Sequence, residues 1–161
     1  MVDTIFRQYD IRGKVGSELS IAEVYDLGKA LAYYFIQNNP NVKTISVGMD
    51  GRTHSPALKE QLCKAFLDSG MNVVFIGICP TPVLYFSLFT LPVDAGIMIT
   101  ASHNTKEYNG FKICLAKESV WGDQIQEIKT LFKGKKALQV AIKGVYSQQD
   151  VIKHYIAQLK K

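Results

Sequence analysis

Apolar residues along this chain follow two different spacings, and the changes between them predict an alternation of strands and helices. Helical spacing is found at about residues 20–37, 55–70, 123–132 and 150–159. Short apolar or alternating runs typical of strands are found at residues 5–13, 44–48, 72–77, 96–99 and 110–115. A short helix is also expected from Thr81 through Phe89. This order predicts parallel strands with helices on both faces of the sheet.

Residues that begin or end helices mark several of these boundaries. Ser20 and Glu23 match a capping box, in which the two side chains bond backbone amides at the helix start. Ser55 and Thr81 each precede a proline, as a cap residue precedes the first residue of a helix. Gly70 suits the left-handed position that ends a helix. We therefore expect helix ends at these positions.

We predict an α/β fold, namely a three-layer α/β/α sandwich with a mixed, mostly parallel sheet and one antiparallel edge strand. Residues 110–115 are the expected antiparallel strand, because only a short turn separates them from the strand before. A length of 161 residues favours one domain with a substantial core. We assign residues 1–147 to this domain. We interpret residues 148–161 as a helix leading into an absent second domain, since nothing after its apolar stripe would cover it.

Composition and charge narrow the possible partners. The net charge is +5, and lysines gather after residue 132, where the single acid is Asp150. Aromatic residues are not interleaved with these lysines as in a single-strand binder, so we predict a solvated surface and no nucleic-acid partner. No apolar run reaches the roughly 20 residues that cross a membrane. Cys63, Cys79 and Cys114 fit no metal or redox motif, which favours a reducing cytoplasm.

One stretch concentrates the candidate chemistry. The apolar run Ile97-Met98-Ile99 ends abruptly in Thr100-Ala101-Ser102-His103-Asn104, as when a buried strand delivers polar groups to the edge of a sheet. Ser102 is followed by an imidazole, a carboxamide and, ten residues later, the amine of Lys112. A serine hydroxyl is a weak nucleophile and needs a base, and cations must neutralise any phosphate that it acquires. The alternative is that Ser102 and Asn104 simply form a turn.

These residues also carry a family resemblance. Thr-Ala-Ser-His-Asn at 100–104, followed by Tyr-Asn-Gly-Phe-Lys at 108–112, resembles the active-site serine loop of the alpha-D-phosphohexomutases, the phosphomannomutase/phosphoglucomutase family. Tyr9-Asp10-Ile11-Arg12-Gly13 is similar to the N-terminal motif of that family, and Gly48-Met49-Asp50-Gly51-Arg52 to its Gly-x-Asp-x-Arg segment. The resemblance implies the first of four domains and the lead-in to the second. Thr105 stands where members usually have proline, which frees the backbone there.

The resemblance implies roles for individual residues. Ser102 would carry the phosphoryl group, and Lys112 would clamp it electrostatically rather than act as a base. Arg12 would grip phosphate oxygens with its planar fork; the alternative is an ion pair with a neighbour such as Asp10. His103 is either a proton carrier or a strut for the loop. The catalytic candidates are Ser102, His103, Lys112 and Arg12, and the substrate- and phosphate-binding candidates are Tyr9, Arg12, Asn104 and Lys112.

Asp50 and Arg52 are interpreted as the framework of the site, pairing with each other or with neighbouring loops. Phosphoryl transfer generally uses Mg²⁺, but this chain has no aspartate cluster to hold it. The family places its triple-aspartate loop in the second domain, so Ser102 would be a ligand only through its phosphate. Glucose 1,6-bisphosphate is the expected activator.

The function implied is that of an intramolecular phosphotransferase of the isomerase class. It would interconvert hexose 1-phosphate and hexose 6-phosphate through a phosphoserine and a bisphosphorylated sugar, with the remaining domains of the same protein as partners. The chain alone is expected to be nearly inactive. The alternatives are a phosphoglucosamine mutase domain, which would share the serine chemistry, and a phosphate- or nucleotide-binding module without catalysis.

Overall fold

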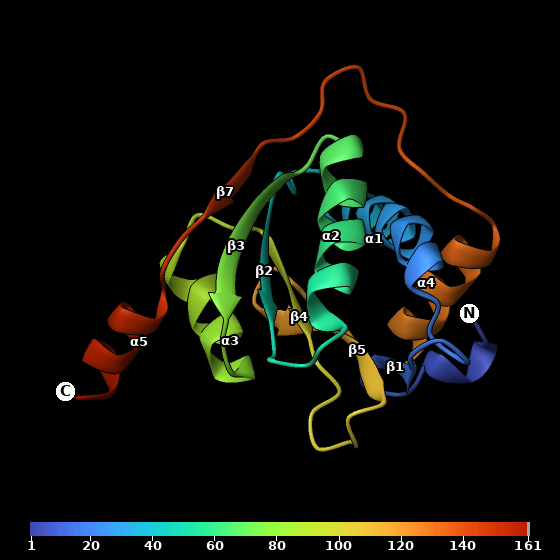
Figure 1. Cartoon of the computed structure of the whole chain (residues 1–161). Coiled ribbons are helices and arrows are strands. Elements are labelled where there is room, and N and C mark those ends of the chain that lie inside the picture. Colours follow the sequence, from blue (N-terminus) through green and yellow to red (C-terminus); the bar gives the residue numbers. More distant parts are fainter. Residues whose placement is uncertain (161) are drawn as a thin grey trace.

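The computed structural model describes residues 1–160 and contains one mixed seven-stranded sheet with helices on both faces (Figure 1). The main strand order is β1-β5-β4-β2-β3-β7, and β6 pairs with β5 outside this path. The strands are β1 (Ile11–Lys14), β2 (Thr44–Met49), β3 (Asn72–Ile78), β4 (Ala95–Ile99), β5 (Tyr108–Leu115), β6 (Glu118–Ser119) and β7 (Tyr146–Gln148). The helices are α1 (Val24–Asn38), α2 (Ser55–Asp68), α3 (Thr81–Thr90), α4 (Asp123–Lys133) and α5 (Ile152–Leu159), with 3-10 turns η1 (Asp3–Ile5) and η2 (Ile21–Glu23).

Strand directions confirm the α/β class and the mixed, mostly parallel sheet. β2 runs parallel to β3 and β4, and β3 runs parallel to β7. β5 is antiparallel to both of its main neighbours, and it lies one position in from the edge because β1 pairs along its outer side. The other edge strand, β7, was not predicted. All of its residues are exposed, and apolar and polar residues do not alternate clearly in the sequence around it.

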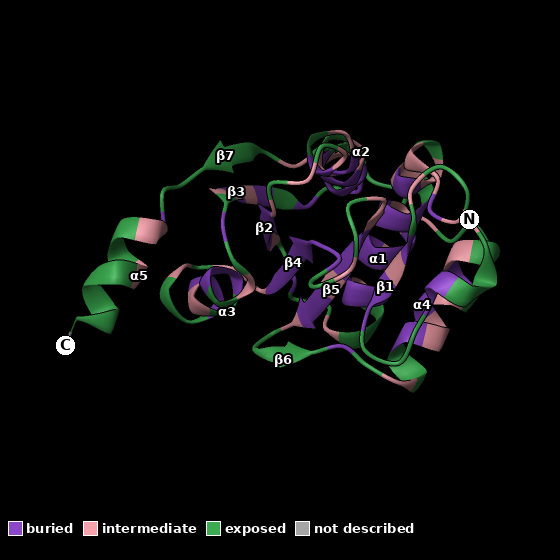
Figure 2. Cartoon of the chain, turned by 60° about the horizontal axis from the view of Figure 1, so that its bottom comes forward, coloured by how far each residue is buried: buried purple, intermediate pink, exposed green. Residues whose placement is uncertain are grey.

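Buried side chains form two clusters, one on each face of the sheet. The larger cluster joins α1, α2 and α4 to the strands, and the smaller lies beneath α3 and the start of α5. Figure 2 shows α1 and α2 on one side of the sheet and α3 on the other. All residues of β4 are buried. Burying each large apolar side chain stabilises the folded state by about 1.5–3 kcal/mol. This central strand is therefore stably held, and so is the start of the loop that follows it.

Three helix starts differ from the cap patterns. The predicted capping box is wrong, because neither Ser20 nor Glu23 caps a backbone amide of the helix start. Glu23 instead accepts a hydrogen bond from the Met1 amine, and the chain enters α1 through η2. Ser55 and Thr81 are the first residues of their helices rather than the caps, so each helix begins one residue before the proline that was expected to start it. The hydroxyl of Ser55 donates to a neighbouring carboxylate.

The C-terminal helix α5 packs against α3 on one side only. The ring of Tyr155 meets that of Phe86 at 5.4 Å, edge to face, and Val151 before the helix is buried. Ile156 and Leu159 remain exposed, so part of the apolar stripe is uncovered. The division of the chain after residue 147 stays a prediction. No helix in the described part of the chain has the length and apolar character to cross a membrane.

The close pairing of β1 with β5 makes one glycine sensitive to substitution. Gly110 pairs with Arg12, and a Cβ at Gly110 would lie 2.1 Å from the backbone oxygen of Ile11. We expect Gly110→Ala to lower the free energy of unfolding by roughly 3 kcal/mol, because backbone must move to admit the methyl group. Denaturant titration measures this loss. A change below about 0.5 kcal/mol, the usual range for surface positions, would show that β1 and β5 separate easily.

Candidate active site

The loop between β4 and β5 carries Ser102 at an exposed position. The backbone N–H of Ser102 donates to Oγ of Thr100 at 3.0 Å, and that of Asn104 donates to the carbonyl of Ala101 at 3.1 Å. Ser102 has a φ of +53°, a left-handed conformation that is uncommon for residues other than glycine. The loop is therefore a tight turn, as one of the two interpretations predicted, and it leaves the residue open to solvent.

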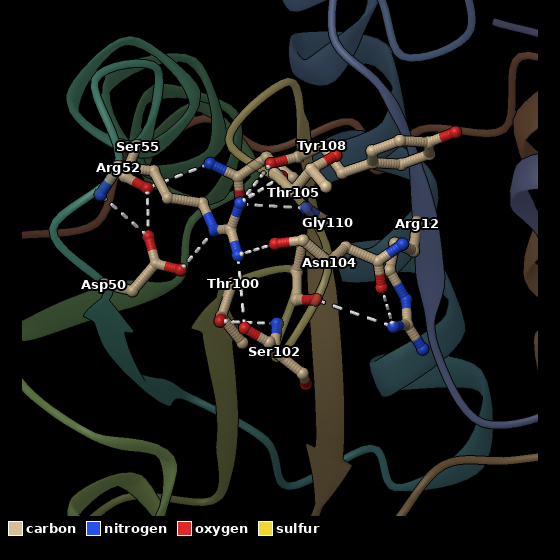
Figure 3. A network of polar contacts seen from close by, with 12 residues as sticks. Arg12, Asp50, Arg52, Ser55, Thr100, Ser102, Asn104, Thr105, Tyr108 and Gly110 are labelled. Carbon is tan, nitrogen blue, oxygen red and sulfur yellow. Dashed lines mark hydrogen bonds and ion pairs between the residues drawn. The ribbon is translucent and has the colours of Figure 1, made fainter.

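The guanidinium of Arg52 binds both Asp50 and the backbone of this loop (Figure 3). An arginine side chain has five N–H donors, and contacts of Arg52 account for all of them. Four of the contacts go to backbone carbonyls of the loop, in which we include Tyr108, the first residue of β5, and one goes to a carboxylate. They are Nη1 to Thr105 at 2.6 Å and Tyr108 at 3.1 Å, Nη2 to Ser102 at 3.1 Å and Asn104 at 2.8 Å, and Nε to Oδ2 of Asp50 at 2.9 Å.

Asp50 fixes Arg52 and links it to the sheet and to α2. Oδ1 of Asp50 accepts from the hydroxyl of Ser55 at 2.7 Å and from the backbone N–H of Arg52 at 3.1 Å. The buried Asn109 of β5 donates to Ser55 Oγ at 2.9 Å, which continues the network. The backbone N–H of Asp50 donates to Ile99, the last residue of β4. This confirms that Asp50 and Arg52 pair with each other and with a neighbouring loop.

The pKa of Asp50 reflects this network. Burial disfavours its charge, but hydrogen bonds from Ser55, Thr100 and Arg52 outweigh burial and lower the pKa below its ordinary value of 3.8. A lowered pKa means that the ionised carboxylate stabilises the folded chain above pH 3.8. That contribution is lost as the pH falls through the folded-state pKa.

We therefore expect the stability difference between the unsubstituted protein and an Asp50→Asn variant to depend on pH. The difference should be constant near neutral pH and should shrink as the pH is lowered below about 4, where the unfolded carboxyl takes up its proton. Urea titrations of both proteins at several pH values measure it. A difference that stayed unchanged down to about pH 2 would mean that folding does not lower the pKa of Asp50 and that the hydrogen bonds do not favour its ionised form.

A second group of charges lies on the other side of the loop, where β1 meets β5. Nη2 of Arg12 pairs with Oδ2 of Asp10 at 2.8 Å, and Nζ of Lys112 lies 3.8 Å from the same oxygen. Nη1 of Arg12 donates to Oδ1 of Asn104 at 2.5 Å and to the carbonyl of Ala101 at 3.5 Å. The ion pair between Arg12 and Asp10, which was the alternative to phosphate binding by Arg12, is present, but Asp10 is buried rather than on the surface. Arg12 thus contacts residues on either side of Ser102.

Sheet register explains why these cations meet. Arg12 of β1 lies directly opposite Gly110 of β5, and Lys112 lies two residues after Gly110 on the same strand. Because residues two apart on a strand share a face, Arg12 and Lys112 project from the same face of the sheet. Lys112 also lines a cavity of about 450 Å³. Its other lining residues are Tyr9, Tyr85, Ile113, Ser119, Val120 and Trp121. Lys112 therefore faces a cleft, and the exposed Tyr9 lies at its wall.

Other chemical groups contribute less to this site. His103 is exposed on the loop.

A larger cavity, of about 910 Å³, lies away from the serine loop. It is lined in part by Asp94, which precedes β4, whereas Ser102 follows the other end of that strand. Burial raises the pKa of Cys63 to about 12 and that of Cys79 to about 11, which makes both thiols poor nucleophiles.

The described residues do not fit a magnesium site. Within residues 1–160 there is no group of three or more His, Cys, Asp or Glu side chains arranged to hold a metal ion. Mg²⁺ typically binds through carboxylates together with phosphate and water oxygens. We therefore derive no step through a metal from this chain.

Sequence reasoning missed two features of the site. It treated Asp10 only as a possible partner of Arg12, whereas Asp10 also faces Lys112. It also did not foresee that Ser55 and Asn109 support Asp50. The position of Asn109 next to the Gly110-Phe111-Lys112 run was the one available signal for the latter.

Comparison with known proteins agrees with the motifs. A sequence profile described as phosphoglucomutase/phosphomannomutase, alpha/beta/alpha domain I, matches residues 3–139. The chain belongs to the phosphoglucomutase/phosphomannomutase family. This confirms the resemblance that the serine loop and the N-terminal motif indicated.

Relatives of this family are about three times longer than the chain. The phosphomannomutase/phosphoglucomutase of Pseudomonas syringae pv. tomato is 41% identical over 159 residues, which are 98% of this chain and 33% of that protein. The phosphomannomutase of Vibrio cholerae is 38% identical over 97% of this chain and 34% of that protein. A family protein of known structure from Burkholderia thailandensis superposes with a TM-score of 0.90 at 32% identity, covering 99% of this chain and 36% of that one. The chain thus spans about a third of these relatives.

Proposed function

We propose that this chain is the catalytic-serine domain of a phosphohexomutase and that Ser102 carries the phosphoryl group. The supporting observation is the placement of Ser102, exposed on a loop that follows a buried strand. Arg52 binds four carbonyls of the loop, and Arg12 contacts Ala101 before the serine and Asn104 after it. An exposed serine on a loop whose backbone is held by two arginines suits reversible transfer of a dianionic group.

The proposed reaction has two transfers. In the first, the bond between phosphorus and Ser102 Oγ breaks as a bond forms to a free hydroxyl of a hexose phosphate, whose proton replaces the phosphoryl group on the serine. The product is a bisphosphorylated hexose. In the second transfer, Ser102 takes the other phosphoryl group, and the isomeric monophosphate leaves. Arg12 and Lys112 stabilise the moving phosphate electrostatically, with Asn104 and Tyr9 as further contacts. His103 either carries a proton or supports the loop.

Other parts of the protein would complete this site. We propose that Mg²⁺, where used, takes most of its ligands from outside this chain, and that the sugar is selected there as well. Relatives of about three times this length leave room for such domains. We therefore propose that residues 1–147 alone turn over hexose phosphates very slowly. The three buried, free cysteines fit the proposal of a reducing cytoplasm.

The test is a coupled assay of glucose 1-phosphate and mannose 1-phosphate conversion with the full-length protein that carries this chain. Glucose 1,6-bisphosphate is supplied as activator. We expect turnover with the unsubstituted protein and a Ser102→Ala variant reduced to the rate without enzyme, because the proposed phosphoryl carrier is lost. A Ser102→Ala variant that folds and still interconverts the sugars would refute a mechanism through this serine.

A further inference from the structure

The carboxylate of Asp10 lies buried between the two cations of the site. Asp10 is 2% exposed, and its Oδ2 faces both Nη2 of Arg12 and Nζ of Lys112, at 2.8 and 3.8 Å. Its Oδ1 is also buried and has no hydrogen-bond partner among residues 1–160. Buried carboxylate oxygens rarely lack a partner, because desolvation without a hydrogen bond is costly. The contacts with Arg12 and Lys112 through Oδ2 thus leave this buried carboxylate only partly satisfied.

The charges next to the serine loop indicate a role for Asp10 beyond its ion pair with Arg12. Arg12 and Lys112 together carry two positive charges, and Asp10 reduces the sum to one. A phosphoserine brings nearly two negative charges. Two uncompensated cations in a partly buried site would hold that dianion strongly, because Coulomb interactions are weakly screened there. Strong binding of the phosphoserine itself slows transfer, since only interactions that are stronger in the transition state accelerate it.

We propose that Asp10 is a charge-balancing and positioning residue that keeps the phosphoryl group on Ser102 transferable. This inference rests on the proposed function. By partly neutralising Arg12 and Lys112, Asp10 brings the free energy of phosphoserine closer to that of the phosphorylated sugar. By pairing with one arm of the Arg12 guanidinium, it also directs the other arm to Asn104. The exchange is balanced: phosphoserine plus sugar hydroxyl gives serine hydroxyl plus sugar phosphate.

The test is an Asp10→Asn variant of the full-length protein, which removes the negative charge of this side chain and keeps its shape. The first readout is the fraction of Ser102 phosphorylated at a fixed ratio of glucose 1,6-bisphosphate to glucose 6-phosphate, measured by intact mass. The second is the Kd for inorganic phosphate, followed by NMR shifts of the serine-loop amides. The matched control is Asp3→Asn, which removes an exposed carboxylate that pairs with Lys133. Folding is checked by circular dichroism and denaturant titration.

If Asp10 balances charge, Asp10→Asn should strengthen phosphate binding, whereas a purely structural role predicts unchanged or weaker binding. Asp10→Asn should shift the equilibrium toward phosphoserine about tenfold and tighten phosphate binding about as much. Turnover and KM should both fall, because the phosphate is held too firmly in the ground state. Asp3→Asn should change none of these quantities. Unchanged or weaker phosphate binding in Asp10→Asn would overturn the inference and leave Asp10 as a support for Arg12.

The two readouts separate failure of this inference from failure of the proposed function. If Ser102 of the unsubstituted protein takes up no phosphate, the proposed function is wrong, and phosphate binding alone then decides the role of Asp10. In that case tighter binding in Asp10→Asn supports charge balance at an anion site, and unchanged binding overturns it. If Ser102 is phosphorylated normally but Asp10→Asn shifts neither readout, only the inference fails.

Discussion

Replacement of Arg52 with alanine should lower the turnover of hexose phosphates by about a hundredfold or more, because it frees the loop that carries Ser102, the proposed phosphoryl carrier. Four loop carbonyls, including that of Ser102 itself, would lose their shared donor. Arg52 is not expected to touch the substrate, so KM should change much less than kcat. Steady-state kinetics of the full-length protein measure both constants. Denaturant titration shows whether the rest of the fold survives.

Two further variants separate loop positioning from charge. Arg52→Lys keeps the charge but offers three donors instead of five, so most of the loss of kcat should remain. Ser55→Ala removes a partner of Asp50 without touching the loop carbonyls, and a smaller loss is expected. If Arg52→Lys were as active as the unsubstituted protein, a positive charge alone would suffice, and the role assigned to the forked contacts would be wrong.

The second large effect is expected at Arg12. Arg12→Lys should lower kcat by about a hundredfold, because an ammonium cannot contact Asp10, Asn104 and a phosphate with the geometry of a planar fork. The loop also loses the 2.5 Å bond between Arg12 and Asn104. Single-turnover transfer from phosphorylated Ser102 to glucose 6-phosphate measures the effect on chemistry. Full activity in Arg12→Lys would place the phosphate away from this guanidinium.

Much of the fold could be predicted because local spacing decides it. Helix α4 buries Ile125, Ile128 and Leu131, the side that the sequence pattern indicates. Gly70 follows α2 with a φ of +79°, as its predicted role requires. The capping box failed because the Met1 amine competes for the carboxylate of Glu23, a contact that spans 22 residues. Such competition between distant groups leaves no local pattern.

In the candidate site, too, local features could be predicted from the sequence, whereas contacts between distant segments could not. The positions of Ser102 at the end of β4 and of Lys112 on β5 could be predicted, because each lies in a contiguous motif beside or within a strand with a clear pattern. The shared contact of Arg12 and Lys112 with Asp10 could not, because it depends on the register of β1 against β5. The same holds for Arg52, whose four loop contacts require β2 and β4 to be neighbours. Thr105, which stands where the family usually has proline, supplies one of the carbonyls that Arg52 binds.

The most direct test of the account is to locate the phosphate. The full-length protein is incubated with glucose 1,6-bisphosphate, digested and mapped by tandem mass spectrometry, with the Ser102→Ala variant treated in parallel. The account predicts one added phosphoryl group, on the peptide that contains Ser102, and loss of that group on addition of excess glucose 6-phosphate. A phosphate found on another residue, or on no residue while the protein still interconverts hexose phosphates, would contradict it.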